Sequence, residues 1–472
     1  MIDAKFFTKE KSILVVGAGR SGMAALRLLA KQGCQLSISD GGPLAKLSTE
    51  DQQWLKEQKV LLEFSGHDVY TFLKADCIVM SPGVPLDAPE LLAAEDKGIP
   101  IIGELELGAL FTDTKIIAVT GTNGKTTVTT MIGEFLAADG RDVFVGGNIG
   151  TPLCEFVAGD DQAEALVLEV SSFQLDTAVS FHPHVAVLLN VSPDHLDRYG
   201  SYEEYIDSKM SIFSRQRRDD FAVINGDDHE IKKRLGGIPS TIRGFGSKKS
   251  SYARLVGNKA LVHLCQDSGE QYQLPGPLNK YPNSDNCLAA IIAARLMGCS
   301  AKAVVKGLAQ FKCLDHRLTE VGTVNGVLYV DDSKATNVGA VKSALSGMAR
   351  PVHLIAGGRD KGGDYGLLAE EIGTKVKSLI VIGEAADKIA AAFAGLTEIF
   401  RAKSMDEAVA LAACEAQPGE VILLSPACAS FDMFSSYGER GDAFQRSVRE
   451  LRQEKTGNAL SSSGKRPLRR AV

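Results

Sequence analysis

The sequence predicts an α/β protein of three consecutive domains, each built on a mostly parallel sheet with helical crossovers. Its 472 residues exceed one ordinary hydrophobic core, and at about 100 to 200 residues per domain the length corresponds to about three domains. Short runs rich in β-branched residues alternate with helical patterns in three successive series along the chain. Two glycine-rich turns each follow such a run and open a helical pattern, which is typical of strand-turn-helix units.

The first series predicts a Rossmann-like domain, residues 1–104. Its expected strands are 13–16, 36–39, 61–64, 77–80 and 101–102. Gly17-Ala18-Gly19-Arg20-Ser21-Gly22 follows the first strand and Asp40 ends the second about twenty residues later, an arrangement that binds a nucleotide diphosphate. Taken alone, this motif indicates an NAD-dependent dehydrogenase, but the same backbone suits another diphosphate ligand or a purely structural unit. Ser81-Pro82-Gly83 follows a later strand, where such sheets bind ligands.

The second series predicts a central domain, residues 105–313, with the architecture of a P-loop ATPase. Its strands are expected from residue 115 and at 143–145, 165–170, 185–189 and 221–224, with a long helix at 287–297. Gly121-Thr122-Asn123-Gly124-Lys125-Thr126-Thr127 follows a β-branched run and opens the helical pattern 128–139. Backbone N–H groups would surround a triphosphate, Lys125 would add a charge, and Thr126 would hold Mg²⁺. The spacing of this loop disfavours GTPases and transporter ATPases, and a triphosphate site argues against NAD in the first domain.

Polar residues follow two further strands of the central sheet. Glu169 ends one strand beside the phosphate loop, which is a position for a Mg²⁺ ligand. Residues 190–197 follow the next strand and place several acceptors and one imidazole, His195, at the same edge. A solvated acidic turn is the alternative interpretation. Lys209 lies on an expected helix at 202–213, where residue chemistry alone does not distinguish it from a surface lysine.

The third series predicts a Rossmann-like C-terminal domain, residues 314–455, with strands at 327–330, 352–356, 379–382 and 421–425. Joints are expected near 103–106 and 312–314, and short β-hairpins at 250–272 with a turn at Gly257-Asn258. We expect residues 456–472 to form a disordered tail. The nine cysteines are scattered and odd in number, so we interpret them as small buried hydrophobic residues and not as disulfides or zinc ligands.

The composition favours small-molecule partners. A net charge of -6 and the lack of a basic stripe give no reason to expect nucleic-acid binding. No apolar run approaches the length of about 20 residues that crosses a bilayer, and the first residues lack a signal-peptide core. We therefore expect no membrane insertion, a cytoplasmic location and a monomer.

Six motifs together resemble the Mur ligases of peptidoglycan synthesis. They are G-T-N-G-K-T-T at 121–127, E-V-S-S-F-Q-L at 169–175, L-N-V-S-P-D-H-L-D-R-Y at 189–199, H-R at 316–317, D-D-S-K-A-T-N at 331–337 and S-P-A-C-A-S-F-D-M-F at 425–434. The last two motifs are similar to those of the D-glutamate-adding branch, and the resemblance extends from about residue 12 to about residue 451. It implies a first domain for a UDP-sugar, a central ATPase domain and a last domain for the incoming amino acid.

The resemblance also implies roles for individual residues. The catalytic set would be Lys125, His195 and Lys209, the last carrying a CO₂-derived carbamate, because an ammonium cannot bind a cation whereas a carbamate offers an anionic carboxylate. ATP would contact Gly121, Thr122, Asn123, Gly124, Lys125, Thr126, Thr127, Asn286, Arg317, Asp332 and Lys334. The UDP-sugar would contact Arg20, Ser21, Asp40, Ser81, Pro82, Gly83, Asn148 and His195. D-Glutamate would contact Thr336, Lys361, Ser430 and Phe431, and two Mg²⁺ ions would be held by Thr126, Glu169, His195 and carbamylated Lys209.

The implied reaction joins the carboxylate of UDP-N-acetylmuramoyl-L-alanine to the amine of D-glutamate, through an acyl phosphate and a tetrahedral intermediate, at the expense of ATP. Two stretches depart from the family pattern: P-L-N-K-Y-P-N-S-D-N at 277–286 replaces a shorter segment that often reads G-x-H-N, and Tyr437 stands where a Phe occurs in a homologue. Three rival interpretations remain. These are a folylpolyglutamate-type ligase, against which the last two motifs argue, a nucleotide-binding regulatory protein without turnover, and an oxidoreductase that uses the first glycine motif.

Overall fold

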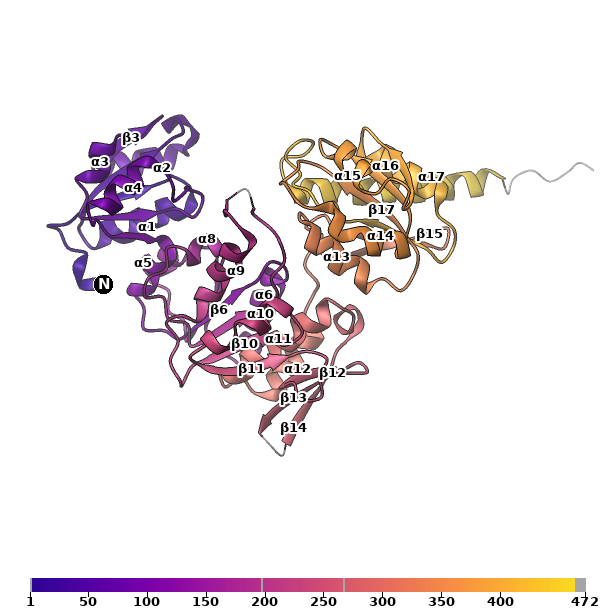
Figure 1. Ribbon diagram of the computed structural model, residues 1–472, viewed down its shortest axis with the longest axis horizontal. Coiled ribbons are helices and arrows are strands. Elements are labelled where there is room, and N and C mark those ends of the chain that lie inside the picture. The colour runs from indigo at the N-terminus through magenta and orange to yellow at the C-terminus, as the bar shows by residue number, and fades with distance from the viewer. Residues whose placement is uncertain (1, 197, 266–267, 463–472) are drawn as a thin grey trace, which may run out of the picture. The chain divides into compact units, whose positions relative to one another are not determined.

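Three sheets form the framework of the protein (Figure 1). The computed structural model describes residues 2–196, 198–265 and 268–462. The sheets fall into two compact units: residues 1–191, 203–279 and 283–311 form the first, and residues 192–202, 280–282 and 312–472 form the second. The predicted α/β class with three consecutive sheets is therefore confirmed, while the first two sheets share one unit.

The N-terminal sheet is entirely parallel, in the order β3-β2-β1-β4-β5. Its strands are β1 (Ser12–Val16), β2 (Gln35–Asp40), β3 (Leu61–Phe64), β4 (Cys77–Met80) and β5 (Ile101–Gly103), and its helices are α1 (Arg20–Lys31), α2 (Thr49–Glu57), α3 (Val69–Leu73) and α4 (Pro89–Asp96). Alternate residues of β1 enter two different cores, Ile13 and Val15 on one face and Leu14 and Val16 on the other. Both faces are thus buried, as continuous apolar strands require.

The central sheet has the order β14-β13-β12-β11-β10-β9-β6-β8-β7 and is parallel from β7 to β12. Its strands are β6 (Ile116–Thr120), β7 (Val143–Gly147), β8 (Ala165–Glu169), β9 (Val185–Leu188), β10 (Phe221–Asn225), β11 (Thr241–Phe245), β12 (Ala253–Val256), β13 (Lys259–Cys265) and β14 (Ser268–Gln273). Its helices are α5 (Glu104–Leu110), α6 (Lys125–Ala138), α7 (Leu153–Ala158), α8 (Ser172–Leu175), α9 (Tyr202–Met210), α10 (His229–Lys233), α11 (Asn283–Leu296) and α12 (Ala301–Gln310). The last three strands are antiparallel hairpins, as predicted, with the turn at Gly257-Asn258.

The C-terminal sheet has the order β15-β16-β20-β17-β18-β19, parallel except for the β15·β16 pair. Its strands are β15 (Thr319–Val324), β16 (Val327–Asp331), β17 (Val352–Gly357), β18 (Val376–Ile382), β19 (Glu398–Arg401) and β20 (Val421–Leu424), and its helices are α13 (Val338–Gly347), α14 (Ala369–Lys375), α15 (Ala386–Ala392), α16 (Met405–Glu415) and α17 (Tyr437–Ser462). Helix α17 includes the first residues of the predicted tail, and residues 463–472 of that tail lie outside the described residues.

Helix α5 explains why the first two sheets share a unit. It begins at the predicted joint, and Glu106 accepts hydrogen bonds from the backbone N–H groups of Ser180 (2.7 Å) and Phe181 (2.9 Å). Glu104 accepts one from the N–H of Cys154 (2.7 Å). Cys154 and Ala158 of α7 belong to the same core as β1 and α1, so apolar packing also crosses this joint.

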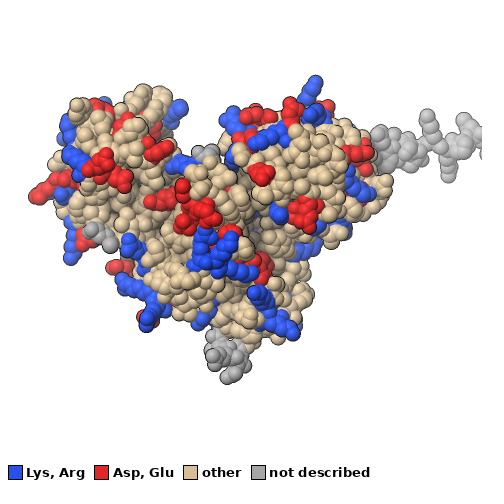
Figure 2. All heavy atoms as spheres, in the orientation of Figure 1, with Lys and Arg blue, Asp and Glu red and all other residues tan. Residues whose placement is uncertain are grey.

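Several sequence-level expectations differ from the structure in detail. Strands β11, β15 and β19 were not expected, because they are short, partly exposed and lack a continuous apolar run. Eight of the cysteines are free, as expected, but Cys414 is exposed and Cys313 only partly buried; the side chain of Cys265 lies outside the description. Within the described residues, no helix has both the length and the apolarity to span a bilayer. On the face drawn in Figure 2, basic and acidic side chains are interspersed.

Candidate active site

The phosphate loop at 121–127 occupies the end of β6 and the start of α6. Gly121 has φ +150° and Gly124 has φ +87°, backbone conformations that side chains rarely adopt. A Cβ on Gly124 would also lie 2.5 Å from Asn286 Oδ1, so Asn286 of α11 packs directly on the loop. Gly124 is the N-cap of α6 and provides no side-chain cap, which leaves the first N–H groups of a 14-residue helix for an anion.

Two lysines bind the same carbonyl oxygen of this loop. Lys125 Nζ donates to Gly121 O (2.8 Å) and Thr122 O (2.9 Å), and Lys209 Nζ donates to Gly121 O from 3.0 Å. The Lys209 side chain is almost completely buried, at 2% exposure. Two ammonium groups on one acceptor concentrate positive charge, which favours either a bound anion or a change in the charge of one lysine.

Asn190, the residue after Leu189 at the end of the β9 segment, holds the loop in place. Its side chain accepts from Asn123 N (2.9 Å) and donates to Asn123 O (3.0 Å), while its own carbonyl accepts from Thr122 N (3.0 Å). Sequence reasoning grouped Asn190 with the polar segment and missed this role. Its position directly after a buried strand was the available signal.

Glu169 ends β8 at the edge predicted from sequence. It pairs with Val119 of β6, and Asn148 Nδ2 donates to Glu169 Oε1 (2.8 Å). The carboxylate is 3% exposed, and Oε2 has no hydrogen-bond partner among the described residues. A buried carboxylate oxygen without a donor fits a divalent cation, because Mg²⁺ prefers oxygen ligands of this kind. The described residues nevertheless contain no ready group of three His, Cys, Asp or Glu ligands.

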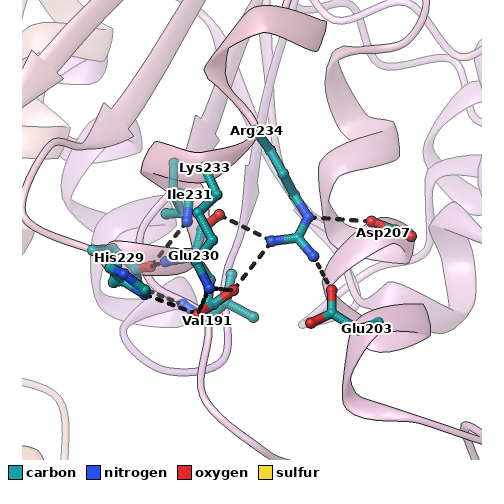
Figure 3. A network of polar contacts seen from close by, with 9 residues as sticks. Val191, Glu203, Asp207, His229, Glu230, Ile231, Lys233 and Arg234 are labelled. Atoms are coloured by element: carbon teal, nitrogen blue, oxygen red, sulfur yellow. Dashed lines mark hydrogen bonds and ion pairs between the residues drawn. The ribbon is translucent and has the colours of Figure 1, made fainter.

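Helix α9 presents Lys209 to the loop and is braced from its other side. On its inner face, Tyr205 OH lies 3.2 Å from Thr122 Oγ1, and Lys209 Nζ lies 4.7 Å from the Tyr205 ring centre. On its outer face, Arg234 forms ion pairs with Glu203 and with Asp207 (3.3 Å), as Figure 3 shows. We call these ion pairs of Arg234 with Glu203 and Asp207 the brace, and they act on the helix that positions Lys209.

Helix α10 also reaches the strand end that precedes the His195 segment. Asp228 caps α10 through the N–H groups of Glu230 and Ile231, and its other oxygen accepts from Val191 N (2.9 Å) (Figure 3). Arg234, just beyond the helix, also pairs with Glu230 (3.2 Å). Val191 and Glu203, the residues on either side of segment 192–202, are thus each bonded to the same short helix region.

His195 itself lies in that segment, which belongs to the second compact unit. It has φ +56°, and its Nε2 lies 3.7 Å from Asp194 Oδ2. Asp194 accepts a hydrogen bond from Asn337 Nδ2 (2.9 Å), and Asn337 caps α13 through Ala340 N. The structure thus brings the His195 segment together with the 331–337 motif. Thr126, Glu169 and Lys209 belong to the first unit.

The first glycine turn is closed by side chains from two neighbouring strands. Asp40 accepts from Ala18 N (2.6 Å) and Gly42 N (2.7 Å), and Ser81 Oγ donates to Gly17 O (2.9 Å). Arg20 is largely exposed and pairs with Glu155 of α7 at 3.6 Å. Ser21 and Pro82 are partly buried beside this turn, and Gly83 is exposed. Six of the predicted UDP-site residues therefore gather at the carboxyl edge of the N-terminal sheet, whereas Asn148 bonds to Glu169 of the central sheet and His195 belongs to the second unit.

In the C-terminal domain, the motifs at 331–337 and 425–434 are bonded to each other. Ala427 N donates to Ala335 O (2.9 Å), and Ser425 Oγ donates to Asp332 Oδ2 (2.9 Å). Burial raises the pKa of Asp332 to about 7, although the Ser425 hydrogen bond opposes this shift. Arg440 of α17, which sequence reasoning missed, is 1% exposed and donates to the backbone of both motifs, at Ser333 O and Cys428 O.

The remaining predicted residues lie on loops around these motifs. Lys334 Nζ lies 3.9 Å from the Tyr437 ring centre, and Lys334 N donates to His316 O (3.0 Å). Arg317, the residue after His316, is partly buried. Arg359 and Ala429 exchange two backbone hydrogen bonds, of 2.9 and 3.1 Å, which bring the loop of Lys361 beside that of Ser430 and Phe431. Ser430 is buried and Phe431 is 64% exposed. Thr336 follows Lys334 in the first motif and is partly buried.

These features define a nucleotide-using α/β enzyme. They are an uncapped helix N-terminus with two lysines, a buried carboxylate beside it, and two further sheets whose carboxyl edges carry polar side chains. Family models match most of the chain: "Mur ligase MurD-like, N-terminal domain" at 11–103, "Mur ligase middle domain" at 119–294 and "Mur ligase, glutamate ligase domain" at 316–428. The chain belongs to the Mur ligase family, within the group of UDP-N-acetylmuramoylalanine–D-glutamate ligases to which its relatives below belong.

Two curated relatives show how extensive the similarity is. The UDP-N-acetylmuramoylalanine–D-glutamate ligase of Geotalea daltonii is 42% identical over 94% of this chain and 98% of its own length. That of Desulfosudis oleivorans is 43% identical over the same shares of the two chains. Among solved structures, MurF ligase from Thermotoga maritima has a TM-score of 0.61 at 18% identity, covering 96% of this chain and 98% of its own. A pseudomurein peptide ligase from Methanothermus fervidus has a TM-score of 0.59 at 19% identity, covering 94% of this chain and all of its own. These two structures support the fold.

Proposed function

We propose that this chain is the ATP-dependent ligase that adds D-glutamate to UDP-N-acetylmuramoyl-L-alanine in the cytoplasmic synthesis of peptidoglycan precursors. The observation that carries the proposal is the pair Lys125 and Lys209 on one carbonyl of an uncapped phosphate loop, within a chain about 42% identical to ligases of that name. The polar motifs of the C-terminal domain supply the amino-acid side of the same reaction.

The central loop activates the acid. A carboxylate is a poor acyl donor, because oxide is a poor leaving group, and phosphorylation by ATP converts it into an acyl phosphate. In this step two anions must approach each other, and the Lys125 ammonium with the first N–H groups of α6 reduces their repulsion. The packing of Asn286 on Gly124 supports its proposed contact with the nucleotide. The amine then attacks, and the tetrahedral intermediate expels phosphate.

Two Mg²⁺ ions would neutralise phosphate charge when bound, with Thr126, Glu169, His195 and Lys209 as the proposed holders. Glu169 suits this role because its Oε2 has no hydrogen-bond partner within the described part of the chain. Lys209 suits it only after conversion of its ammonium into a carbamate, which replaces one of two neighbouring positive charges by a carboxylate. The crowding of Lys125 and Lys209 at Gly121 O supports that conversion.

The flanking domains would deliver the two halves of the new amide. Arg20, Ser21, Asp40, Ser81, Pro82, Gly83 and Asn148 are proposed to bind the UDP-sugar. Thr336, Lys361, Ser430 and Phe431 are proposed for D-glutamate, and Arg317, Asp332 and Lys334 for the nucleotide. The backbone bridge between Arg359 and Ala429 joins the loops of Lys361 and Ser430, which supports a shared carboxylate site because these loops carry a cation and a hydroxyl.

One assay separates this function from its rivals. Purified protein is mixed with ATP, Mg²⁺, D-glutamate and UDP-N-acetylmuramoyl-L-alanine, and ADP release is measured together with the mass of the product. We expect ADP release to require both substrates and to equal amide formation. Use of a folate substrate instead, nucleotide binding without turnover, or hydride transfer to NAD would each contradict the proposal.

The carbamate makes a separate prediction. Lys209→Ala should lower kcat on the order of 10³-fold, because the site loses an anionic ligand, and small carboxylates such as formate should restore part of the activity. Lys233→Ala, an exposed lysine on α10, is the control and should neither lose activity nor respond to formate. Full activity of Lys209→Ala without any supplement would rule out this role.

A further inference from the structure

A buried hydroxyl links a carboxylate and a histidine at the edge of the N-terminal sheet. Ser39, on β2 next to Asp40, is fully buried, and its Oγ donates to Glu63 Oε2 on β3. The same Oγ lies 2.6 Å from Nδ1 of His67, whose side chain is otherwise exposed. The His67 ring also meets the buried Phe72 edge to face, with 5.9 Å between ring centres, so its plane is held at two points.

Counting protons along this chain of contacts determines which imidazole nitrogen carries hydrogen. Glu63 Oε1 accepts hydrogen bonds from Asp68 N and Thr71 Oγ1, both at 3.0 Å. The Glu63 carboxylate is therefore the acceptor in these contacts as well as in its contact with Ser39. Ser39 has a single hydroxyl proton, and it donates this proton in the hydrogen bond to Glu63. The contact between Ser39 and His67 must then be donated by Nδ1–H. In neutral His67, Nε2 is therefore the bare acceptor.

The surroundings of Nε2 indicate which part of a ligand it would meet. A Cβ on Gly41 would lie 3.5 Å from Nε2, so this nitrogen faces the two-glycine turn directly after Asp40. In a Rossmann-like sheet the diphosphate lies at the glycine turn before α1, and the acidic residue at the end of the second strand lies at the nucleoside. His67 is thus beside the nucleoside end, away from the diphosphate.

We propose that His67 is a specificity residue of the nucleotide-sugar site, whose Nε2 accepts a hydrogen bond from an N–H or O–H donor of the uridine moiety, with Ser39 and Glu63 fixing the tautomer. The inference rests on the proposed function, because it assumes that a uridine nucleotide binds at this edge. Both oxygens of Asp40 already accept hydrogen bonds from backbone N–H groups, which reduces their capacity to accept from a ligand. His67 Nε2 would supply a second acceptor for the uridine moiety at this place.

Glu63→Gln is the sharpest test because it replaces an acceptor oxygen by a donor NH₂ group with almost no change in side-chain volume. The amide oxygen would remain with Asp68 N and Thr71 Oγ1, and the NH₂ group would face Ser39 Oγ. Ser39 would then donate to Nδ1, which leaves the hydrogen on Nε2 facing a ligand donor. We expect the KM for the UDP-sugar to rise about tenfold or more, as for a lost and opposed hydrogen bond, with kcat and the KM for ATP within twofold of wild type.

His67→Ala should raise the same KM by a similar factor, and Ser39→Ala, which frees the tautomer, should have a smaller effect. His229→Ala, an exposed histidine on α10, is the matched control and should change nothing. Binding of uridine monophosphate, measured by calorimetry on the full chain, should weaken in parallel for Glu63→Gln and His67→Ala, while binding of inorganic pyrophosphate stays unchanged.

The tautomer can be observed directly. Side-chain ¹⁵N spectra of histidine-labelled full-length protein should show His67 protonated at Nδ1 in the wild type and at Nε2 in Glu63→Gln. A wild-type Nε2–H form, or unchanged uridine monophosphate affinity in both variants, would overturn the inference. These readouts need no turnover, so an inactive wild type would contradict the proposed function separately.

Discussion

The two glycine turns of this protein share a backbone plan and differ in what fills them. Each follows a parallel strand and opens a helix, at Gly17–Gly22 and at Gly121–Gly124. In the first, a Cβ on Gly22 would lie 1.9 Å from Gly17 O and 2.9 Å from Ser81 Oγ, so backbone and side chains occupy the turn. In the second, lysines and an asparagine surround the loop. Both helices begin at a glycine N-cap without a side-chain cap, so the difference lies in the surrounding groups. Neighbouring strands, more than the glycines, decide what each turn can bind.

The carboxylates beside the turns differ in the same way. Asp40 has both oxygens engaged, one by the N–H of Ala18 in the glycine turn and one by the N–H of Gly42 just after β2, so it organises the loop. Glu169 has a buried oxygen that no described residue contacts by a hydrogen bond, so this oxygen is available to a cation. A satisfied group stabilises the fold, whereas an unsatisfied one in a buried site indicates a missing ligand.

The largest effect is expected for Lys125→Ala, which tests whether the two glycine turns have different roles. Loss of the cation at the second turn should lower kcat on the order of 10³-fold and prevent acyl-phosphate formation, with the affinity for the UDP-sugar largely intact. Arg20→Ala at the first turn should do the reverse, raising the KM for the UDP-sugar with kcat nearly unchanged. Steady-state kinetics for both substrates check this, and an equal loss of UDP-sugar affinity in Lys125→Ala would count against the assigned role.

Crowding at the first turn can be tested by adding one methyl group. Gly22→Ala should destabilise the protein by roughly 3 kcal/mol, because its Cβ meets the carbonyl of Gly17. Gly19→Ala is the control: it has no heavy atom within 4 Å of the added Cβ and no left-handed φ, so the midpoint of urea unfolding should hardly change. Equal destabilisation by the two substitutions would show that flexibility and not packing requires glycine here.

A pH measurement tests the joint that connects the two turns in one unit. Burial raises the pKa of Glu104 to about 7, so between pH 4.5 and 7 the folded state keeps a proton that the unfolded chain has released. Stability should therefore fall as pH rises through this window, by roughly 2 to 3 kcal/mol, and remain lower above it. In Glu104→Gln this slope should disappear from urea unfolding curves; an unchanged slope would assign it to other groups.

The smallest effect is expected at the brace behind the second turn. Arg234→Ala removes the ion pairs to Glu203 and Asp207 on α9. Because an ion pair with an exposed carboxylate stabilises by about 1 kcal/mol or less, kcat should fall about three- to fivefold. Lys233→Ala removes only a pair to Glu230 and should have no effect. If high salt lowers wild-type kcat to the level of Arg234→Ala, the brace acts electrostatically.

Much of this architecture could be predicted from local patterns. Buried parallel strands are continuous apolar runs, and a glycine turn between strand and helix fixes a phosphate loop, so β6, α6 and the edge position of Glu169 followed from the sequence. Polar edge strands such as β19 could not be foreseen, because their signal lies in pairing partners distant along the chain. Lys209 resembled any helical lysine until family motifs singled it out.

The three α/β series, the two glycine turns and the residues of the phosphate loop follow from local sequence, because these features depend on spacing of two to four residues and on backbone conformations that glycine allows. Three contacts were visible only in the folded chain: two lysines share the Gly121 carbonyl, Arg440 joins two motifs, and Ser39 orients His67. Those contacts join residues far apart along the chain, and burial and hydrogen-bond partners of that kind are set by how strands and helices pack.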